Sequence, residues 1–334
     1  MDRLNAPGRS LPRAVLPLLC LGAFVVAGFP EKPKIEEVGL IFDEPAGRMT
    51  VLIGGREAVV YLYGDGLDLP HYWPMRSPSG KNMLIEKTEP YPHHRSFWFA
   101  DTVRPEGSER DVSFYNALYG GVKTEAGEYI PPFRDRIRHQ FFRRLDATGG
   151  RADIEAQLVW EMDGRRPVLD ERRRLVVHSL GAGEYLLDLN WTLTASHGDV
   201  LFASDDVHYA WPFLRLDTSF SGEKGGKITS DNGASGQEAT NMKPALWIDY
   251  SNSVDGLPEG VAVFQWPDGR QHRWLTREYG TFGPRRPDDR SGKPFTLKKG
   301  EPITQRVGVL VHNGDASGGR VRERYKKYVK GGWK

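Results

Sequence analysis

A long stretch of alternating apolar and polar residues in the middle of the chain is the feature that most constrains its fold. Successive side chains of a β-strand point to opposite faces, so a period of two indicates strands with one buried and one exposed face. The first such strand spans residues 154–162 and ends at the turn residues Asp163 and Gly164. A second strand is expected around residues 171–178 and a third at residues 185–193. Together they predict a three-stranded antiparallel meander with one wet face.

Shorter pieces of the same pattern occur elsewhere in the chain. The pair Gly54-Gly55 separates two β-branched runs, which predicts a tight hairpin. Two Gly-rich stretches, residues 220–236 and 279–293, are expected to be long loops, which in a compact protein often bind ligands. From Gly319 onward, apolar residues at helical spacing predict a short amphipathic C-terminal helix. Further strands are expected at residues 206–216, 245–250, 260–266 and 304–312.

These elements predict an all-β fold, a large antiparallel β-sandwich with a short C-terminal helix. No linker, repeat or low-complexity tract interrupts the pattern. We therefore expect residues 29–334 to form a single domain.

The first 28 residues have the sequence of charged, apolar and small segments that is typical of a secretory signal peptide. Arg3, Arg9 and Arg13 precede a largely apolar, uncharged run at residues 14–28, which ends in small residues. This run is shorter than the roughly 20 apolar residues that a helix needs to span a bilayer, so cleavage is favoured over an uncleaved membrane anchor. We expect export to the periplasm or the extracellular space, and no membrane span after cleavage.

Loss of residues 1–28 would change the charge and the reactive groups of the chain. The count of Lys and Arg falls from 46 to 43 and that of Asp and Glu from 44 to 43, so the formal net charge of +2 becomes zero. A balanced charge argues against nucleic acid as a partner. Cys20 is the only cysteine, so the remaining chain has neither a thiol nucleophile nor a thiolate metal ligand.

The segment from Tyr91 to Ala100 is the densest in groups that can do chemistry. His93 and His94 can act as acid or base near neutral pH, and Arg95 can bind an oxyanion with two parallel hydrogen bonds. Trp98 offers a flat face to a sugar ring. In a strand, neighbouring side chains point to opposite faces, so one of the two histidines can instead be a hydrogen-bonded core residue.

A second group of ionisable residues lies further along the chain. Asp206 and His208 would share one face of a strand, where the carboxylate can orient the imidazole. The alternative is a turn acid followed by a solvent-facing histidine. Glu171, Arg173 and Arg277 are the charges most expected to point inward, because strong alternation surrounds them, although charge runs more often form a solvated face.

Several known motifs are absent from the sequence. Residues 222–229 resemble a P-loop but are one residue short, and no Ser or Thr follows Lys227. Neither H-E-x-x-H nor G-x-S-x-G occurs. His197, Gly198 and Asp199 match part of a non-haem iron pattern, but they are read more simply as a turn. No cofactor or metal site is predicted.

The order of several segments resembles a known bacterial family. These segments are HHRSFWFA from residue 93, ERR at residues 171–173, ALWIDYS at 245–251, GVAVFQWPD at 260–268 and W-x-x-R-x-Y-G-x-F at 274–282. They are similar to secreted proteins of unknown function that carry the label "methane oxygenase PmoA". The resemblance runs from about Tyr61 to His312 and implies a large sandwich like that of sugar mutarotases, a mutarotase-like supersandwich.

The leading functional hypothesis is a carbohydrate-active enzyme, either a sugar epimerase or a glycoside-cleaving enzyme, that uses His and carboxylate groups as acid and base. Its partner would be a carbohydrate or another small molecule. The alternatives are a non-catalytic glycan-binding or cell-surface module, and a metal-dependent oxidoreductase. The catalytic residues in the leading hypothesis are His94, His208, Asp206 and Glu171. The substrate-binding residues are His93, Arg95, Trp98, Arg173, Arg277 and Tyr279.

Overall fold

Antiparallel β-sheets dominate the computed structural model, which describes residues 33–88, 94–114, 135–203 and 210–333. The predicted signal peptide and three predicted site residues, His93, Asp206 and His208, lie outside these ranges. None of the helices within the described ranges is both long and hydrophobic enough to cross a lipid bilayer.

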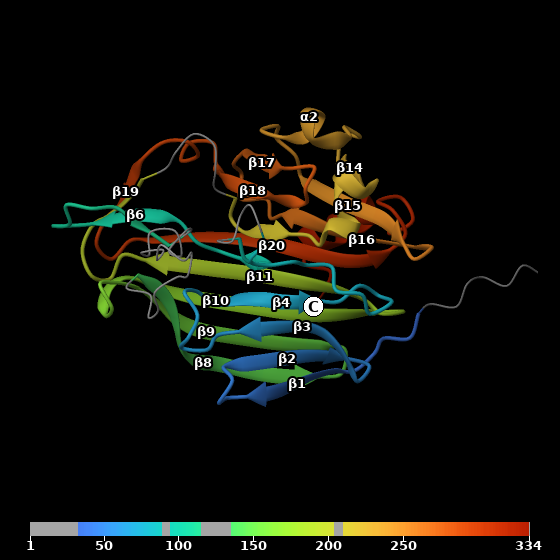
Figure 1. The fold of residues 1–334 in the computed structure, drawn as a ribbon, viewed down its shortest axis with the longest axis horizontal. Coiled ribbons are helices and arrows are strands. Elements are labelled where there is room, and N and C mark those ends of the chain that lie inside the picture. Colours follow the sequence, from blue (N-terminus) through green and yellow to red (C-terminus); the bar gives the residue numbers. More distant parts are fainter. Residues whose placement is uncertain (1–32, 89–93, 115–134, 204–209, 334) are drawn as a thin grey trace, which may run out of the picture. The chain divides into compact units, whose positions relative to one another are not determined.

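Sheet I combines the N-terminal hairpins with strands from the later part of the chain (Figure 1). The predicted Gly54-Gly55 hairpin is confirmed, because the strands on either side of it pair in antiparallel register. The strand order of sheet I is β1 (Val38–Asp43), β2 (Arg48–Ile53), β3 (Arg56–Leu62), β4 (His71–Met75), β5 (Phe97–Trp98), β13 (Phe213–Arg215), β18 (Thr281–Pro287) and β17 (His272–Thr276).

Sheet II is built around the predicted meander. Arg173 pairs with Ala156 on one side and with Trp191 on the other, which confirms the three antiparallel strands. The strand order of sheet II is β14 (Lys227–Ser230), β15 (Trp247–Val254), β16 (Leu257–Gln265), β20 (Pro302–Asn313), β11 (Glu184–Thr194), β10 (Arg166–Gly181), β9 (Arg151–Met162) and β8 (Arg136–Thr148).

The remaining elements are short. Sheet III has the strand order β19 (Phe295–Leu297), β12 (Val200–Phe202), β6 (Thr102–Pro105) and β7 (Val112–Ser113). The helical segments are η1 (Thr218–Phe220), η2 (Gly222–Lys224), α2 (Gly236–Thr240) and α3 (Val321–Val329). Helix α3 confirms the predicted C-terminal helix. The prediction of long loops at 220–236 and 279–293 is wrong, because these stretches contain η2, β14 and β18.

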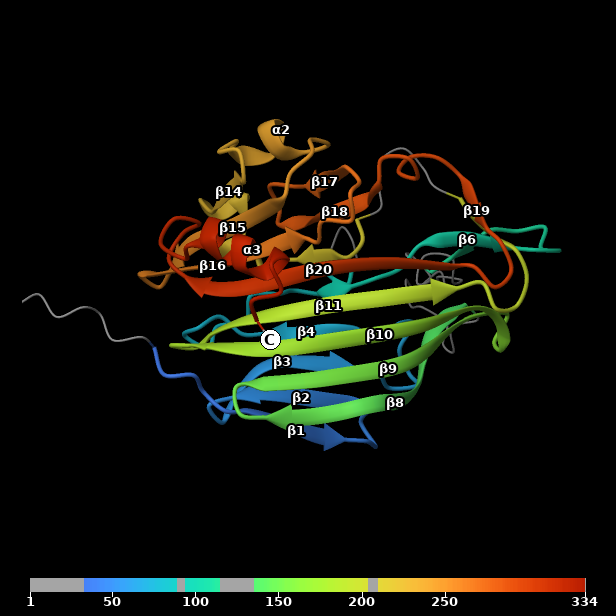
Figure 2. The ribbon, with the colours of Figure 1, turned by 180° about the vertical axis from the view of Figure 1, so that it is seen from behind.

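Sheets I and II pack face to face, and the core lies between them (Figure 1). Val59 of β3 and Leu175 and Leu187 of the meander belong to the same buried cluster, so the apolar faces of both sheets meet. This arrangement confirms the predicted β-sandwich. On the opposite face of sheet II, α3 packs through Tyr325 and Tyr328 (Figure 2). Sheet II is therefore covered on both faces at this end.

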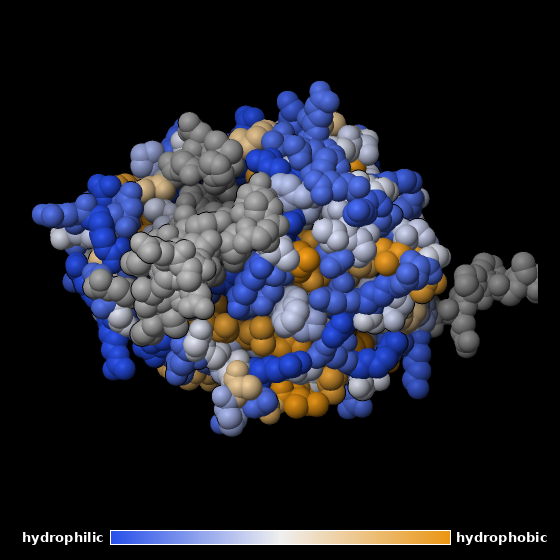
Figure 3. All heavy atoms as spheres, in the orientation of Figure 1, coloured by the Kyte–Doolittle hydropathy of each residue, from blue (hydrophilic) through white to orange (hydrophobic). Residues whose placement is uncertain are grey.

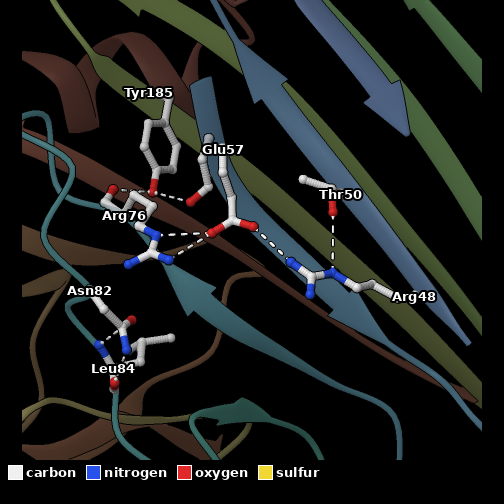
Figure 4. A network of polar contacts seen from close by, with 8 residues as sticks. Arg48, Thr50, Glu57, Arg76, Asn82, Leu84 and Tyr185 are labelled. Carbon is white, nitrogen blue, oxygen red and sulfur yellow. Dashed lines mark hydrogen bonds and ion pairs between the residues drawn. The ribbon is translucent and has the colours of Figure 1, made fainter. Parts of the chain in front are cut away.

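A polar contact also joins the two sheets. The Tyr185 hydroxyl of β11 donates to the Arg76 carbonyl oxygen at 2.6 Å and lies 3.1 Å from that of Ala58 in β3 (Figure 4). Arg76 in turn donates to Glu57, which also accepts from Arg48. Burial raises the pKa of Tyr185, so its hydroxyl stays protonated and can donate this bond.

The edge strands of both sheets expose apolar side chains. Figure 3 shows apolar atoms gathered near the lower edge of the molecule, where Figure 1 places β1. The large exposed apolar residues of β1 and β8 are Ile41, Phe42, Phe141 and Leu145.

Candidate functional site

A group of polar side chains lies where β4 and β5 meet β13 and residues 84–87. Backbone hydrogen bonds hold these segments side by side, with Ile85 N donating to Arg215 O at 3.1 Å and Lys87 N donating to His94 O at 3.0 Å. Arg215 N also donates to Ser96 O at 2.6 Å. We call the side chains gathered here the β5 cluster. Its members are Asp68, His71, Glu86, His94, Arg95, Trp98, Arg215 and Tyr279.

A histidine–glutamate pair lies at one side of the β5 cluster. His71 Nε2 is 2.8 Å from Glu86 Oε2, and His71 Nδ1 is 3.0 Å from the Leu69 carbonyl oxygen. Both ring nitrogens therefore lie within hydrogen-bonding distance of oxygen atoms. His71 has no exposed surface, whereas the Glu86 side chain is 14% exposed. Glu86 is therefore the more exposed member of the pair.

The surroundings of Glu86 keep it ionised. Burial raises the pKa of its carboxyl, but the hydrogen bond and the charge of His71 outweigh this effect, and Lys87 and Arg95 add to it. The net result is a pKa below the ordinary value for Glu. At neutral pH, Glu86 is a carboxylate that can accept a proton from a substrate or stabilise a positive charge.

Arg95 is held by a buried carboxylate. Its Nη2 donates to Asp68 Oδ2 at 2.6 Å and its Nε donates to Asp68 Oδ1 at 3.2 Å, which is a two-bond contact between nearly unexposed side chains. The sequence predicted that Arg95 binds substrate. The structure places its fork against Asp68 beside Glu86, so the charge of Arg95 acts on the β5 cluster.

Two further contacts of the β5 cluster involve β5 and β13. The His94 ring lies 5.6 Å from that of Trp98, which stacks on Phe213 at 4.7 Å. The Arg215 guanidinium lies over the Tyr279 ring at 4.5 Å and donates to the Tyr279 carbonyl oxygen. The fold thus places His94 beside Trp98 and Tyr279 beside Arg215. Trp98 is 1% exposed, so its ring packs against protein.

Glu171 and Arg173 face the interior between the sheets. Arg173 Nε donates to Glu171 Oε1 at 2.6 Å, and Glu171 Oε2 accepts from Trp160 Nε1 at 2.7 Å. Arg173 Nη1 donates to the Pro70 carbonyl oxygen at 3.1 Å. This bond ties the pair to the segment that carries Asp68 and His71. Glu171 itself has no exposed surface.

Arg277 lies apart from the β5 cluster. Its Nη1 donates to Asn241 Oδ1 at 2.7 Å, and its backbone nitrogen donates to the Tyr250 hydroxyl at 3.2 Å. These contacts place Arg277 between β15 and the end of α2.

Sequence reasoning missed Asp68, His71, Glu86 and Arg215. Each is a charged or ionisable residue beside apolar neighbours, but none belongs to a recognisable motif or to a long alternating strand. An isolated charge beside apolar residues, such as Glu86 after Met83, Leu84 and Ile85, is the only signal that could have marked them.

Within the described ranges, no group of three or more His, Asp or Glu side chains is arranged to hold a metal ion. The β5 cluster offers two carboxylates, two histidines and two arginines beside the buried Trp98 ring.

Several solved structures are similar to this chain, although the likeness is distant. One is the GH36 alpha-galactosidase AgaA from Geobacillus stearothermophilus, with 10% identity over 85% of this chain and a TM-score of 0.44. Another is the alpha-galactosidase from Lactobacillus brevis, with 7% identity over 83% of this chain and a TM-score of 0.43. This chain covers 42% and 40% of those proteins. A polysaccharide lyase matches with 13% identity, 86% of this chain, 34% of its own chain and a TM-score of 0.35.

The family comparison covers most of the sequence. No curated protein sequence matches the chain significantly. The comparisons give no support for the methane oxygenase PmoA label. A family model described as a family of unknown function, DUF6807, matches residues 48–326, which include the β5 cluster and every strand of the two large sheets except β1. The chain therefore belongs to the DUF6807 family.

Proposed function

We propose that this protein is a carbohydrate-active enzyme that moves protons at a sugar ring, and that the reaction takes place at the β5 cluster. The observation that carries the proposal is the Glu86–His71 pair, in which a fixed, ionised carboxylate is still partly exposed. Glu86 is the proposed base, and His94 on the neighbouring segment is the proposed acid. Arg95, which Asp68 holds in place, would act through its charge, which helps to keep Glu86 ionised.

The arrangement of carboxylates favours proton transfer over glycoside hydrolysis. Glycoside hydrolysis usually needs two carboxyl groups flanking the bond, one of them protonated. The second carboxylate of the β5 cluster, Asp68, is already engaged by both Arg95 nitrogens. One partly exposed carboxylate, Glu86, and a histidine match the needs of an epimerisation or an elimination, in which one group removes a proton and another returns or donates one.

Export belongs to the same proposal. A signal peptide at residues 1–28 would deliver the enzyme to the periplasm or the extracellular space, where polysaccharide fragments are available. Expression of the full chain in a Gram-negative host, followed by mass spectrometry of the periplasmic fraction, tests this. A product that begins near residue 29 supports export, and a full-length cytoplasmic product contradicts it.

The enzymatic part is tested on purified protein that starts at residue 29. A panel of neutral and acidic mono- and oligosaccharides is followed by proton NMR of the anomeric region, which detects epimerisation, elimination and glycosidic cleavage alike. On the substrate found, we expect Glu86→Gln to lower kcat roughly 100- to 10,000-fold, because loss of a general base has effects of this size. His94→Gln should also lower kcat.

Glu57→Gln is the matched control, because Glu57 is a partly exposed glutamate of sheet I that also binds arginines but lies in β3 (Figure 4). Its kcat should stay close to that of the parent protein. Full turnover by Glu86→Gln, or no turnover of any sugar in the panel, would contradict the proposed function.

A further inference from the structure

The outer face of sheet II carries an open groove on the side of the sheet away from sheet I. Two adjoining pockets of about 390 and 280 Å³ share four lining residues, so they form one continuous groove. The groove crosses β9, β10, β11 and β20 and ends beside α3 (Figure 2). The shared residues are Arg174, Val176, Asp188 and Arg306.

Strand register places hydrogen-bond donors in one row across the groove. Arg174 of β10 pairs with Asn190 of β11, and Asn190 pairs with Arg306 of β20. Paired residues of neighbouring strands have side chains on the same face. The row therefore presents a guanidinium, a carboxamide and a second guanidinium side by side, with the two arginines separated by two strand spacings, about 10 Å between their backbones.

Carboxylates beside this row hold the arginines in fixed orientations. Arg174 donates from Nε and Nη2 to Asp153 at 2.8 and 2.6 Å, and Arg306 donates from Nε to Asp188 at 2.8 Å. Asp153 also accepts from Arg151 at 2.9 Å. The bond from Arg174, opposed in part by burial, lowers the pKa of Asp153 to about 2, so this carboxylate stays charged.

Donors remain after these contacts are made. Within the described ranges, no hydrogen-bond partner is found for Arg174 Nη1, the Asn190 carboxamide or the guanidinium of Arg172, which also lines the groove. The lining contains four arginines, Arg151, Arg172, Arg174 and Arg306, but only two carboxylates, Glu155 and Asp188. The lining thus has excess positive charge and unused N–H groups, one of them on Arg174, which Asp153 holds in place.

Aromatic rings form the wall at the α3 end of the groove. The Arg306 guanidinium lies 3.7 Å from the centre of the Trp266 ring, and Lys327 Nζ lies 3.5 Å from that of Trp333. Contacts of this kind fix cations against flat apolar surfaces. The groove therefore presents apolar surface next to the charged row.

His178 lines the groove at its Arg151 end. Burial lowers its pKa to about 4, with Arg151 and Lys327 acting in the same direction and Asp188 and Asp153 opposing them. His178 is therefore neutral at pH 7, and its ring lines the groove without adding charge.

We propose that this groove is a binding site for the oxyanion group of a negatively charged ligand, a carboxylate or a sulfate ester, centred on Asn190 between Arg174 and Arg306. Two arginines with an amide between them match the geometry of an oxyanion, which accepts several hydrogen bonds at once. The site lies on the opposite sheet from the β5 cluster and does not depend on the proposed function.

Isothermal titration calorimetry on the protein starting at residue 29 tests the proposal with three probes: trigalacturonate, inorganic sulfate and neutral galactotriose. We expect trigalacturonate or sulfate to bind at least about tenfold more tightly than galactotriose, with affinity falling as salt rises. Tighter binding of trigalacturonate would indicate a carboxylate site, and tighter binding of sulfate would indicate a sulfate site. Equal binding of galactotriose, or no binding of any probe below about 10 mM, would overturn the proposal.

Two variants locate the binding site. Arg174→Gln removes one guanidinium, and Asn190→Asp places a carboxylate between the arginines, where it competes with the ligand. Each should weaken anion binding about tenfold or more, while Asn190→Asp keeps its melting temperature because its new charge faces two cations. Arg273→Gln is the matched control: Arg273 is about as exposed as Arg174 and is likewise paired with one aspartate, but it lies in β17. Anion binding unchanged in both groove variants would refute the site.

Discussion

Arg173 and Glu171 form a fully buried ion pair between the two sheets, with Nε 2.6 Å from Oε1 and side-chain exposures of 2% and 0%. The second Glu171 oxygen accepts from Trp160, and Arg173 also binds the Pro70 carbonyl oxygen. The Glu171 carboxylate has a hydrogen bond at each oxygen and no surface that a substrate could reach. The pair therefore supports the segment that carries Asp68 and His71. We expect its main effect to be on the stability of the fold and not on catalysis.

The Glu171→Gln substitution should consequently destabilise the protein. It removes the negative charge but leaves the Arg173 guanidinium buried without compensation, which typically costs about 3–5 kcal/mol. The free energy of unfolding from urea titration measures this loss. Asp111→Asn is the matched control, because Asp111 forms an exposed pair with Arg104 and its loss should cost no more than about 1 kcal/mol. A Glu171→Gln protein of normal stability that has lost its turnover would favour the catalytic role expected from the sequence.

A second buried pair, His312 and Asp249, predicts a pH dependence of stability. Burial lowers the pKa of His312, but the charge and hydrogen bond of Asp249, 2.7 Å away, outweigh it and raise the pKa above the ordinary value. In the unfolded chain, a histidine titrates near pH 6.5. The stabilisation is thus fully present below about pH 6.5 and is lost as the pH rises through the higher folded-state pKa.

Urea unfolding of the parent protein and of His312→Gln, measured from pH 6 to pH 9, tests this dependence. The parent should lose stability across this range, and the loss should be smaller in the variant. Parallel curves for the two proteins would mean that His312 does not titrate in this interval, contrary to the expectation.

The strands of sheet II could be predicted because they combine long alternation with strong β-formers. The meander of β9, β10 and β11 has an unbroken period of two, and its inward residues are those that the pattern indicated. Strand β8, at the edge of the sheet, could not be predicted because its four arginines and one histidine interrupt the alternation of apolar and polar residues. Strand β18 could not be predicted because Gly283 and two prolines interrupt its sequence, although all its residues are buried.

The candidate site was less predictable, for a different reason. Neighbours in sequence, His94 and Trp98, could be placed together from one segment. Glu86 and His71 meet only because residues 84–87 pair with β13 and His94, a contact between segments with no shared pattern. Alternation reveals which face a residue occupies, but it carries no information on which distant segment lies across from it.

Gly260 offers a test of packing around His312. A Cβ atom at Gly260 would lie 2.7 Å from His312 Cε1 and 2.9 Å from Ser251 Cβ, so alanine at this position must displace a buried ring. We expect Gly260→Ala to lower the free energy of unfolding by about 1–3 kcal/mol, as overpacking usually does. Gly66→Ala is the control, because a Cβ there meets nothing within 4 Å. Equal stability of the two variants would show that the His312 ring moves aside freely.

His139 of β8 predicts a loss of stability in mild acid. Its ring lies 4.5 Å from the rings of Tyr63 and Phe142, and burial, with the positive charge of Arg173 adding to it, lowers its pKa to about 4. The unfolded chain binds a proton at this position near pH 6.5, so stability should fall as the pH drops from about 6.5 to 4.

Replacing His139 with glutamine removes this proton-binding site and should make the decline in the free energy of unfolding shallower in urea titrations at pH 4, 5 and 6.5. The His139→Gln protein keeps His178, which has a similarly lowered pKa, so part of the decline should remain. An unchanged slope in the variant would mean that the His139 ring is hydrated and protonates freely in the folded protein.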